Sequence, residues 1–247
     1  MFKKVLAVML CSVMIAGSLT GCGEGKEKVP EYSIQNFTAP AKGEEIVVLT
    51  IKDYGDIKIK VFDEFADKGA ENFKGLAKKG YYDGVIFHRV IEGFMIQGGD
   101  PEGTGRGGES IWGGKFEGGA STNLYHFAGA VAYANSRGTS TNGSQFNIVT
   151  GEKQTDASLD RYEKSIIQNY GRKPYTDEVK EKYKEIGGTP FLDGGYTVFG
   201  QVIDGLDIVY KISQVETNER DKPVKDIVIE KATVVKYDGS EIHWTIE

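Results

Sequence analysis

The sequence predicts a mainly β fold, an antiparallel barrel capped by helices, and two observations support that prediction. Short runs of strand-like residues recur along most of the chain, with only two or three helical patterns between them. Glycine is abundant, at 33 residues, and proline is scarce, at 6, a balance that suits a turn-rich β protein. The formal net charge of −6 disfavours nucleic acid as the main partner, because phosphate binding needs a basic patch.

The first 22 residues have the layout of an export signal. Two lysines precede a short apolar run, and "LTGC" at 19–22 resembles the bacterial lipoprotein signal, in which the cysteine becomes the lipidated N-terminus. We expect removal of 1–21, a lipid on Cys22, and a flexible polar tether over 22–43. This places the protein at the extracytoplasmic face of the cell membrane, although an uncleaved membrane anchor is the alternative.

The first half of the domain, which is expected over 44–247, begins with a hairpin at 45–62. Lys58 and Lys60 alternate there with apolar residues, which predicts one wet and one buried face. A helix is expected over 66–80, ended by a glycine. Two short strands then follow, joined near Glu92–Gly93.

The second half adds four strands and one short helix. The strands are expected at 129–135, 144–150, 196–205 and 224–237, and the helix at 207–213.

Residues 151–188 interrupt this pattern with two helical stripes. We expect a helical insertion that packs on the barrel and takes no part in chemistry. The alternative is that this insertion docks a partner at the cell surface.

Several apparent motifs carry little chemistry. "GTGRGG" at 103–108 has glycine spacing typical of dinucleotide sites, but no helix follows it. His88, His126 and His243 lack metal-ligand spacing, and the first two are expected to be hydrogen-bonded packing residues. Ser144 has no strand–turn–helix elbow around it, so a hydrolase is not indicated.

The stretch "FHRVIEGFMIQGGD" at 87–100 is unusual because it sets a cation and an amide in an apolar strand pair. It resembles the central signature of the cyclophilins, the cyclophilin-type peptidyl-prolyl isomerases. The similarity continues in "GTGRGGESIWGGKF", "AYAN", "TNGSQF" and "LDGGYTVFGQV", and spans about 45–237 without the insertion. It implies an eight-stranded antiparallel barrel with a helix at each end, and an enzyme that uses no cofactor or metal.

The chemistry implied by the resemblance fits these residues. Rotation about an Xaa–Pro bond breaks no covalent bond, and the obstacle is amide resonance. By resemblance, Arg89 is the catalytic donor that stabilises the twisted bond, and Gln97 orients this arginine and the substrate. An arginine suits the task because it stays charged and its planar fork holds direction.

The same resemblance implies the substrate pocket. Apolar walls around the proline ring come from Phe94, Met95 and Leu192. Ala134 and Asn135 match the segment that pairs with the substrate backbone, and Gln145 points to the same face.

Three further positions of the pocket depart from the best-known members of the family. Asn147 stands where many carry an aromatic floor, Phe191 where many have tryptophan, and Tyr196 where many have histidine. Asn147 in particular is expected to make the pocket floor polar, which bears on the depth of the pocket and its affinity for proline.

We therefore expect a monomeric, lipid-anchored isomerase that acts on proline-containing polypeptides of exported proteins. The alternative is a chaperone or scaffold module that holds proline segments with little catalysis. The motif around Arg89 favours the enzyme, whereas Asn147 favours the module.

Overall fold

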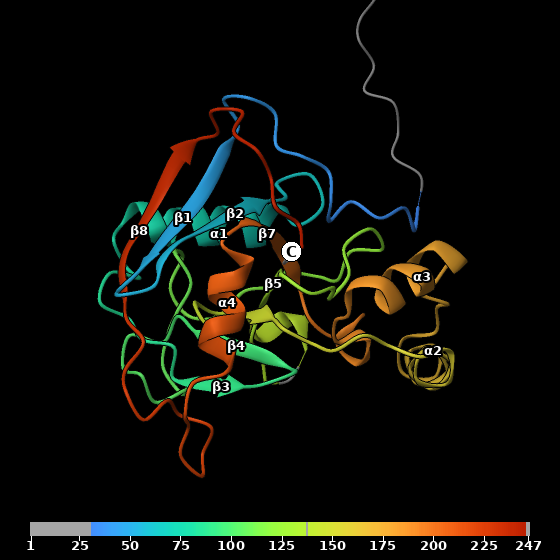
Figure 1. Cartoon of the computed structure of the whole chain (residues 1–247). Helices are drawn as coiled ribbons and strands as arrows, with labels where there is room; N and C mark the ends of the chain where they lie inside the picture. Colours follow the sequence, from blue (N-terminus) through green and yellow to red (C-terminus); the bar gives the residue numbers. More distant parts are fainter. Residues whose placement is uncertain (1–30, 137, 246–247) are drawn as a thin grey trace, which may run out of the picture.

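The computed structural model describes residues 31–136 and 138–245, and in them one eight-stranded antiparallel sheet curls around the core (Figure 1). The strand order is β3-β4-β6-β5-β7-β2-β1-β8. The strands are β1 Glu45–Ile51, β2 Gly55–Val61, β3 Arg89–Ile91, β4 Met95–Gly98, β5 Ala130–Tyr133, β6 Phe146–Val149, β7 Val198–Asp204 and β8 Ile229–Lys236. The predicted fold class and the eight predicted strands are confirmed.

The two edges of the curled sheet meet through the segments that precede β3 and β8. The backbone N–H of Phe87 donates to the carbonyl of Ile227 at 3.0 Å, and Ile229 donates to Val85 at 2.9 Å. These bonds satisfy backbone groups that an open edge would leave unpaired. The sheet therefore closes toward a barrel around a core of inward side chains.

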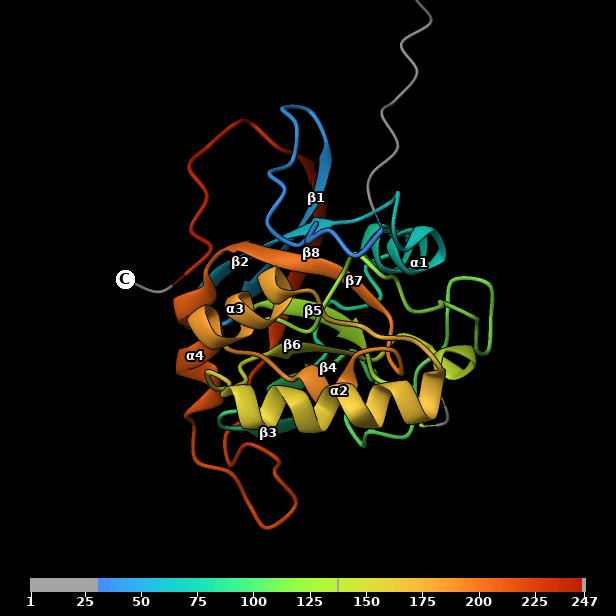
Figure 2. The ribbon, with the colours of Figure 1, turned by 90° about the vertical axis from the view of Figure 1, so that its right-hand side faces the viewer.

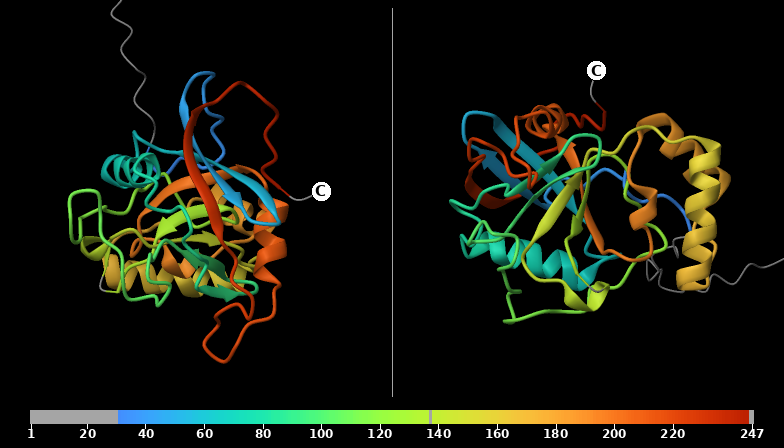
Figure 3. Two further views of the ribbon diagram at one scale, coloured as in Figure 1. Left: turned by 90° about the vertical axis from the view of Figure 1, so that its left-hand side faces the viewer. Right: turned by 90° about the horizontal axis from the view of Figure 1, so that it is seen from below.

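One helix lies at each end of the sheet, as the right panel of Figure 3 shows for α1 Asp67–Lys78 and α4 Leu206–Ser213. Phe73 of α1 is fully buried, and its ring lies 5.2 Å from that of Phe146 and 4.9 Å from that of Phe199. The helices therefore close the ends with apolar side chains, which is the cap that the sequence predicted.

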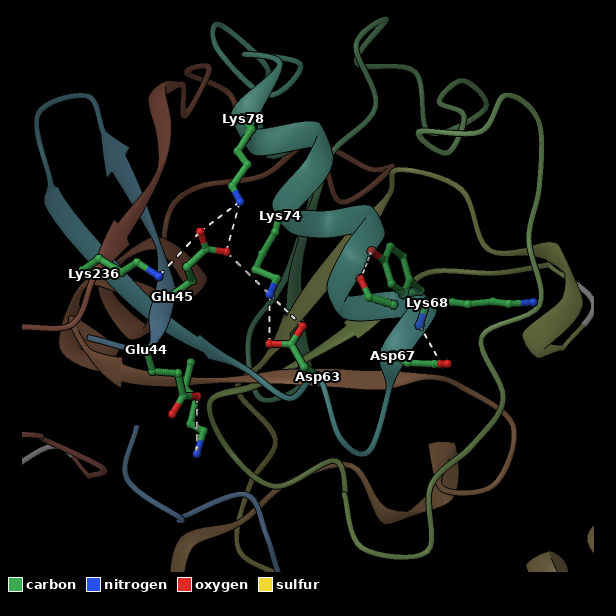
Figure 4. Close-up of polar contacts among 11 residues, drawn as sticks. Glu44, Glu45, Asp63, Asp67, Lys68, Lys74, Lys78 and Lys236 are labelled. Carbon is green, nitrogen blue, oxygen red and sulfur yellow. Dashed lines mark hydrogen bonds and ion pairs between the residues drawn. The ribbon is translucent and has the colours of Figure 1, made fainter. Parts of the chain in front are cut away.

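Ion pairs fix how α1 lies on the sheet (Figure 4). Glu45 at the start of β1 pairs with Lys78 at 3.0 Å and with Lys74 at 3.8 Å, and Lys74 also pairs with Asp63 at 2.6 Å. The hydrogen bond from Lys78 lowers the pKa of Glu45 below its ordinary value, against a smaller opposing effect of burial. Exposed pairs of this kind contribute about 0–1 kcal/mol each, so they orient the helix more than they stabilise it.

The insertion forms a helical lobe beside the sheet, and Figure 2 shows α2 running across the front of the molecule on that side. It holds α2 Asp156–Tyr170 and α3 Asp177–Ile186, and is followed by the short helix η2 Pro190–Leu192. A second short helix, η1, spans Thr139–Thr141. Four residues of the predicted apolar stripes are buried in a separate small core against Tyr125 and Phe127, namely Leu159, Ile166, Val179 and Tyr183, whereas Tyr170 is 49% exposed. The prediction that these helices pack on the barrel is therefore confirmed.

The described part of the expected tether differs from the prediction, because residues 31–43 lie against the domain. Asn36 is fully buried, donates to the carbonyl of Tyr125 at 2.9 Å and accepts from the N–H of Tyr125 at 3.0 Å. The same segment covers Lys60, whose ammonium donates to the carbonyl of Thr38 at 2.8 Å. Lys60 is therefore buried instead of lying on a wet face, and burial lowers its pKa.

The predicted signal peptide, Cys22 and the first part of the tether lie outside the described residues. Within residues 31–136 and 138–245, every helix is too short or too polar to cross a membrane.

Candidate functional site

A cavity of about 370 Å³ opens beside the strand pair β3–β4 and gathers most of the predicted site residues. Its lining includes Arg89, Phe94, Met95, Gln97, Ala134, Asn135, Asn147, Leu192 and Tyr196. A second cavity of about 360 Å³ adjoins it and shares four of the lining residues, Gln97, Gly105, Ala134 and Asn135. Gln145 lines this second cavity, and Phe191 lies outside both linings.

Strand register brings the polar residues of the first cavity into one row. Arg89 on β3 is paired with Gln97 on β4, which is paired with Asn147 on β6, which is paired with Ala132 on β5. Residues opposite each other in antiparallel strands have side chains on the same face. The alternating residues Val90, Ile96 and Phe146 point into the core and are almost fully buried.

The guanidinium of Arg89 is held by a residue that the sequence analysis did not name. Its Nε donates to Oδ2 of Asp221 at 3.3 Å, and both side chains are about two-fifths exposed, at 41% and 43%. The carbonyl of Asp221 also accepts the N–H of Val90 at 2.8 Å, which ties its loop to β3. Asp221 has a φ of 61°, a conformation that aspartate tolerates better than most residues.

Gln97 takes different partners from those that the resemblance implies. Its amide donates to Oε1 of Gln145 at 3.0 Å, and the amide of Gln145 donates to the carbonyl of Gly107 at 2.8 Å. Gln97 thus lies across from Arg89 in the register, while Arg89 donates its side-chain hydrogen bond to Asp221.

His88 corrects the expectation of a hydrogen-bonded packing residue. It is buried, lines the cavity, and neither of its ring nitrogens has a partner within the described residues. Burial lowers the pKa of His88, while the charge of Asp100 opposes this shift. The expectation is confirmed for His126, whose Nδ1 lies 2.7 Å from Oδ1 of Asp193.

The glycine-rich turn at 103–108 wraps around a buried carboxylate. Both oxygens of Asp100 accept backbone N–H groups, which come from Glu102, Thr104, Gly105, Arg106 and Gly107. Burial alone would raise the pKa of Asp100, but these hydrogen bonds outweigh it and lower the pKa. The turn therefore folds around its own anion and places Thr104 and Gly105 in the cavity wall.

Asn147 gives the cavity a polar floor. The side chain is buried, with 6% exposed, and its Oδ1 has no partner within the described residues. A buried acceptor without a hydrogen bond costs about 1–3 kcal/mol, so it attracts a water or a donor on the ligand.

The part of the cavity wall formed by Leu192 depends on the insertion. Leu192 of η2 lines the cavity, and its neighbour Asp193 is buried. Oδ2 of Asp193 accepts the hydroxyls of Tyr183 at 2.6 Å and Tyr175 at 3.1 Å. Burial, and then the charge of Asp193, raise the pKa of Tyr183 well above its ordinary value, so this hydroxyl stays a donor.

Four lining residues were missed by the sequence analysis, namely His88, Thr104, Gly105 and Arg220. His88 precedes β3, so strand alternation does not predict where it points. Arg220 lies on the same distant loop as Asp221, and the sequence carries no signal that this loop returns to β3. Within the described residues, no group of three or more His, Cys, Asp or Glu side chains is placed to hold a metal.

Comparisons with known proteins agree on one family. A family model described as cyclophilin type peptidyl-prolyl cis-trans isomerase/CLD matches residues 46–234. A Staphylococcus aureus (strain USA300) protein whose name gives it as a peptidyl-prolyl cis-trans isomerase is 44% identical over 190 residues, which cover 77% of this chain and 92% of that protein.

Two further relatives differ more in length or sequence. A Streptococcus pyogenes protein, named as a bifunctional phosphatase/peptidyl-prolyl cis-trans isomerase, is 44% identical over 83% of this chain, which spans only 41% of its length. The crystal structure of a Cryptosporidium parvum cyclophilin type peptidyl-prolyl cis-trans isomerase, solved in the presence of the dipeptide Ala-Pro, matches with a TM-score of 0.59. It is 30% identical, and the match covers 77% of this chain and 99% of that one.

The state of His88 predicts a loss of stability in mild acid. Burial lowers the pKa of His88 in the folded protein, whereas in the unfolded chain this histidine takes up a proton near pH 6.5. The contribution of the unprotonated His88 to the free energy of unfolding is therefore complete above about pH 6.5. It is lost as the pH falls toward the lower pKa that His88 has in the folded protein. In urea unfolding between pH 7.5 and 5, the free energy of unfolding should fall more steeply with decreasing pH for the wild type than for His88→Gln. Equal slopes for the two proteins would contradict this account.

Proposed function

Since the chain belongs to the cyclophilin-type peptidyl-prolyl cis-trans isomerases, we propose that the cavity beside β3–β4 is its proline site, with Arg89 as the catalytic residue. The enzyme accelerates rotation about the peptide bond before proline and binds proline-containing peptides. The observation that supports the site is the row of Arg89, Gln97 and Asn147 beside the apolar wall of Phe94, Met95 and Leu192.

The reaction needs a donor and a shaped pocket more than it needs an acid, a base or a nucleophile. Amide resonance sets a barrier of about 18–20 kcal/mol. The resonance weakens, and the barrier falls, when a donor stabilises the lone pair of the prolyl nitrogen. Asp221 accepts the hydrogen bond from Nε of Arg89. In the described part of the chain, no group accepts a hydrogen bond from the terminal Nη atoms. Those groups remain to donate to the twisted peptide.

The hydrogen bond from Arg89 supplies only part of the free energy that the acceleration requires, and the pocket must supply the rest. A hydrogen bond to a charged group contributes about 1.5–3 kcal/mol, whereas a thousandfold acceleration requires about 4 kcal/mol. The apolar wall must supply the difference by holding the proline ring better in the twisted state than in the planar one. Ala134 and Asn135 align the substrate backbone along the boundary between the two cavities.

The cellular setting rests on the N-terminal sequence. We infer that the chain is exported, lipidated at Cys22 and held at the extracytoplasmic face of the membrane, where it acts as a monomer on exported proteins during folding. The lysines, apolar run and "LTGC" of the first 22 residues support this inference. A closed sheet with its own core supports the monomer, because the eight strands pair within one chain.

The direct test of the proposed site is cis/trans exchange of a short Xaa-Pro peptide with wild type and Arg89→Ala. We expect the variant to lose at least tenfold in rate with an unchanged fold, because the donor to the twisted amide is removed. The exchange rate with Arg89→Lys should lie between those of the wild type and Arg89→Ala, since lysine keeps the charge and loses the planar fork. An unchanged rate in a folded Arg89→Ala variant would refute the assignment.

The contact between Asp221 and Arg89 generates a second prediction. Asp221→Asn should lower kcat by about three- to tenfold, with little change in KM, because the guanidinium loses its charged anchor while asparagine tolerates the same backbone conformation.

Asp226→Asn is the matched control for Asp221→Asn. Asp226 lies on the same loop and pairs with Lys222 at 3.5 Å. Its variant should keep the wild-type kcat. Equal losses in both variants would mean that the loop, and not the Arg89 contact, is responsible.

The lipid anchor is tested by Cys22→Ser. Because the thiol is the acceptor for the lipid, this variant should lose lipid attachment and fractionate differently, as an unprocessed precursor or a soluble form. Metabolic labelling with a fatty acid, followed by fractionation, measures both properties. Wild-type protein that is never found with membranes would contradict the inference.

A further inference from the structure

Three aromatic rings continue the wall of the cavity onto the insertion, and we call them the aromatic ledge: Phe94, Phe191 and Tyr162. Phe94 lines the cavity at the start of β4. Its ring centroid lies 5.6 Å from that of Phe191 on η2, which lies 5.7 Å from that of Tyr162 on α2. The ledge therefore joins residues far apart in the sequence into one continuous surface.

The outer part of the ledge faces solvent, although its supports are buried. Phe191 is 48% exposed, whereas the residues on either side of it, Pro190 and Leu192, are buried. On α2, Leu159 and Ile166 are buried and hold the helix that carries Tyr162. An exposed aromatic ring on a fixed support is pre-organised for contact, because little conformational entropy remains to be lost.

We propose that the aromatic ledge binds an apolar side chain, best an aromatic one, of the same polypeptide whose proline occupies the cavity. This rests on the proposed function, because the proline fixes where the rest of the peptide lies. The two ring separations place Tyr162 no more than about 11 Å from Phe94, a span of about three residues of extended chain. The ledge thus gives the enzyme a preference for substrates with an aromatic residue about three positions from proline.

The continuity with the cavity favours this occupant over a second copy of the chain. A stable dimer buries about 1,600 Å² in total, whereas a single aromatic side chain buries about 150–250 Å². Three partly covered rings suit one or two side chains. Arg161 lies over the ring of Tyr162 at 5.0 Å and covers part of the outer end, which further limits the free surface.

The experiment compares three peptides that share one Xaa-Pro core, using the full chain. The reference peptide has serine three residues before and three residues after proline, and each of the others has phenylalanine in place of one serine. We expect kcat/KM to be about fivefold higher for one phenylalanine peptide than for the reference, the size of one aromatic contact. Tyr162→Ala should reduce this preference below about twofold and leave the rate on the reference peptide unchanged.

Two variants serve as controls. Tyr162→Phe keeps the ring and should keep the preference. Trp112→Ala removes an aromatic side chain that is also 48% exposed but lies outside both cavities, and it too should keep the preference.

The outcomes separate this proposal from the function on which it rests. Equal rates on all three peptides in the wild type, or a preference that survives Tyr162→Ala, would overturn the ledge and leave the proline site intact. No acceleration of any peptide would overturn the proposed site itself, and the ledge with it.

Discussion

The register of the β3–β4 hairpin is the constraint on which the site depends. The turn is closed by the N–H of Phe94 donating to the carbonyl of Ile91 at 3.1 Å, with Gly93 at a φ of 69°, where a side chain would be strained. A slip of one residue would turn Arg89 and Gln97 into the core and Val90 and Ile96 outward. Burial of those two apolar residues thus fixes the position of the Arg89 guanidinium.

Two buried carboxylates hold the loops that the sheet cannot position. Asp100 gathers the backbone N–H groups of the glycine-rich turn, and Asp193 gathers the hydroxyls of Tyr175 and Tyr183 from the insertion. A buried charge is costly unless it is fully hydrogen-bonded, so each loop has essentially one arrangement that satisfies its carboxylate. Gly105 and Leu192, which both line the cavity, are held in place in this way.

The sequence predicted the strands and helices well because their residues follow local periods that burial enforces. The family resemblance assigned Met95 and Gln97 to the pocket, and both line the cavity while Ile96 between them is buried. The sequence could not predict contacts that depend on where a loop returns, such as Asp221 on Arg89. The same limit explains Lys60, whose burial under residues 31–43 contradicts the polar pattern of its own strand.

In an enzyme that forms no covalent bond, the groups that orient Arg89 affect how well it stabilises the twisted peptide. A guanidinium that is two-fifths exposed gains little from a general electrostatic field, since water screens it, so its effect depends on direction. Asp221 supplies that direction from one loop, while Tyr183 of the insertion holds Asp193, the neighbour of Leu192. The direction of Arg89 and the position of Leu192 are therefore set by separate segments, both outside the sheet that carries Gln97 and Asn147. Asn147 makes the floor of the cavity polar, and Phe191 lies outside both cavity linings, so both departures leave the contact between Arg89 and Asp221 in place.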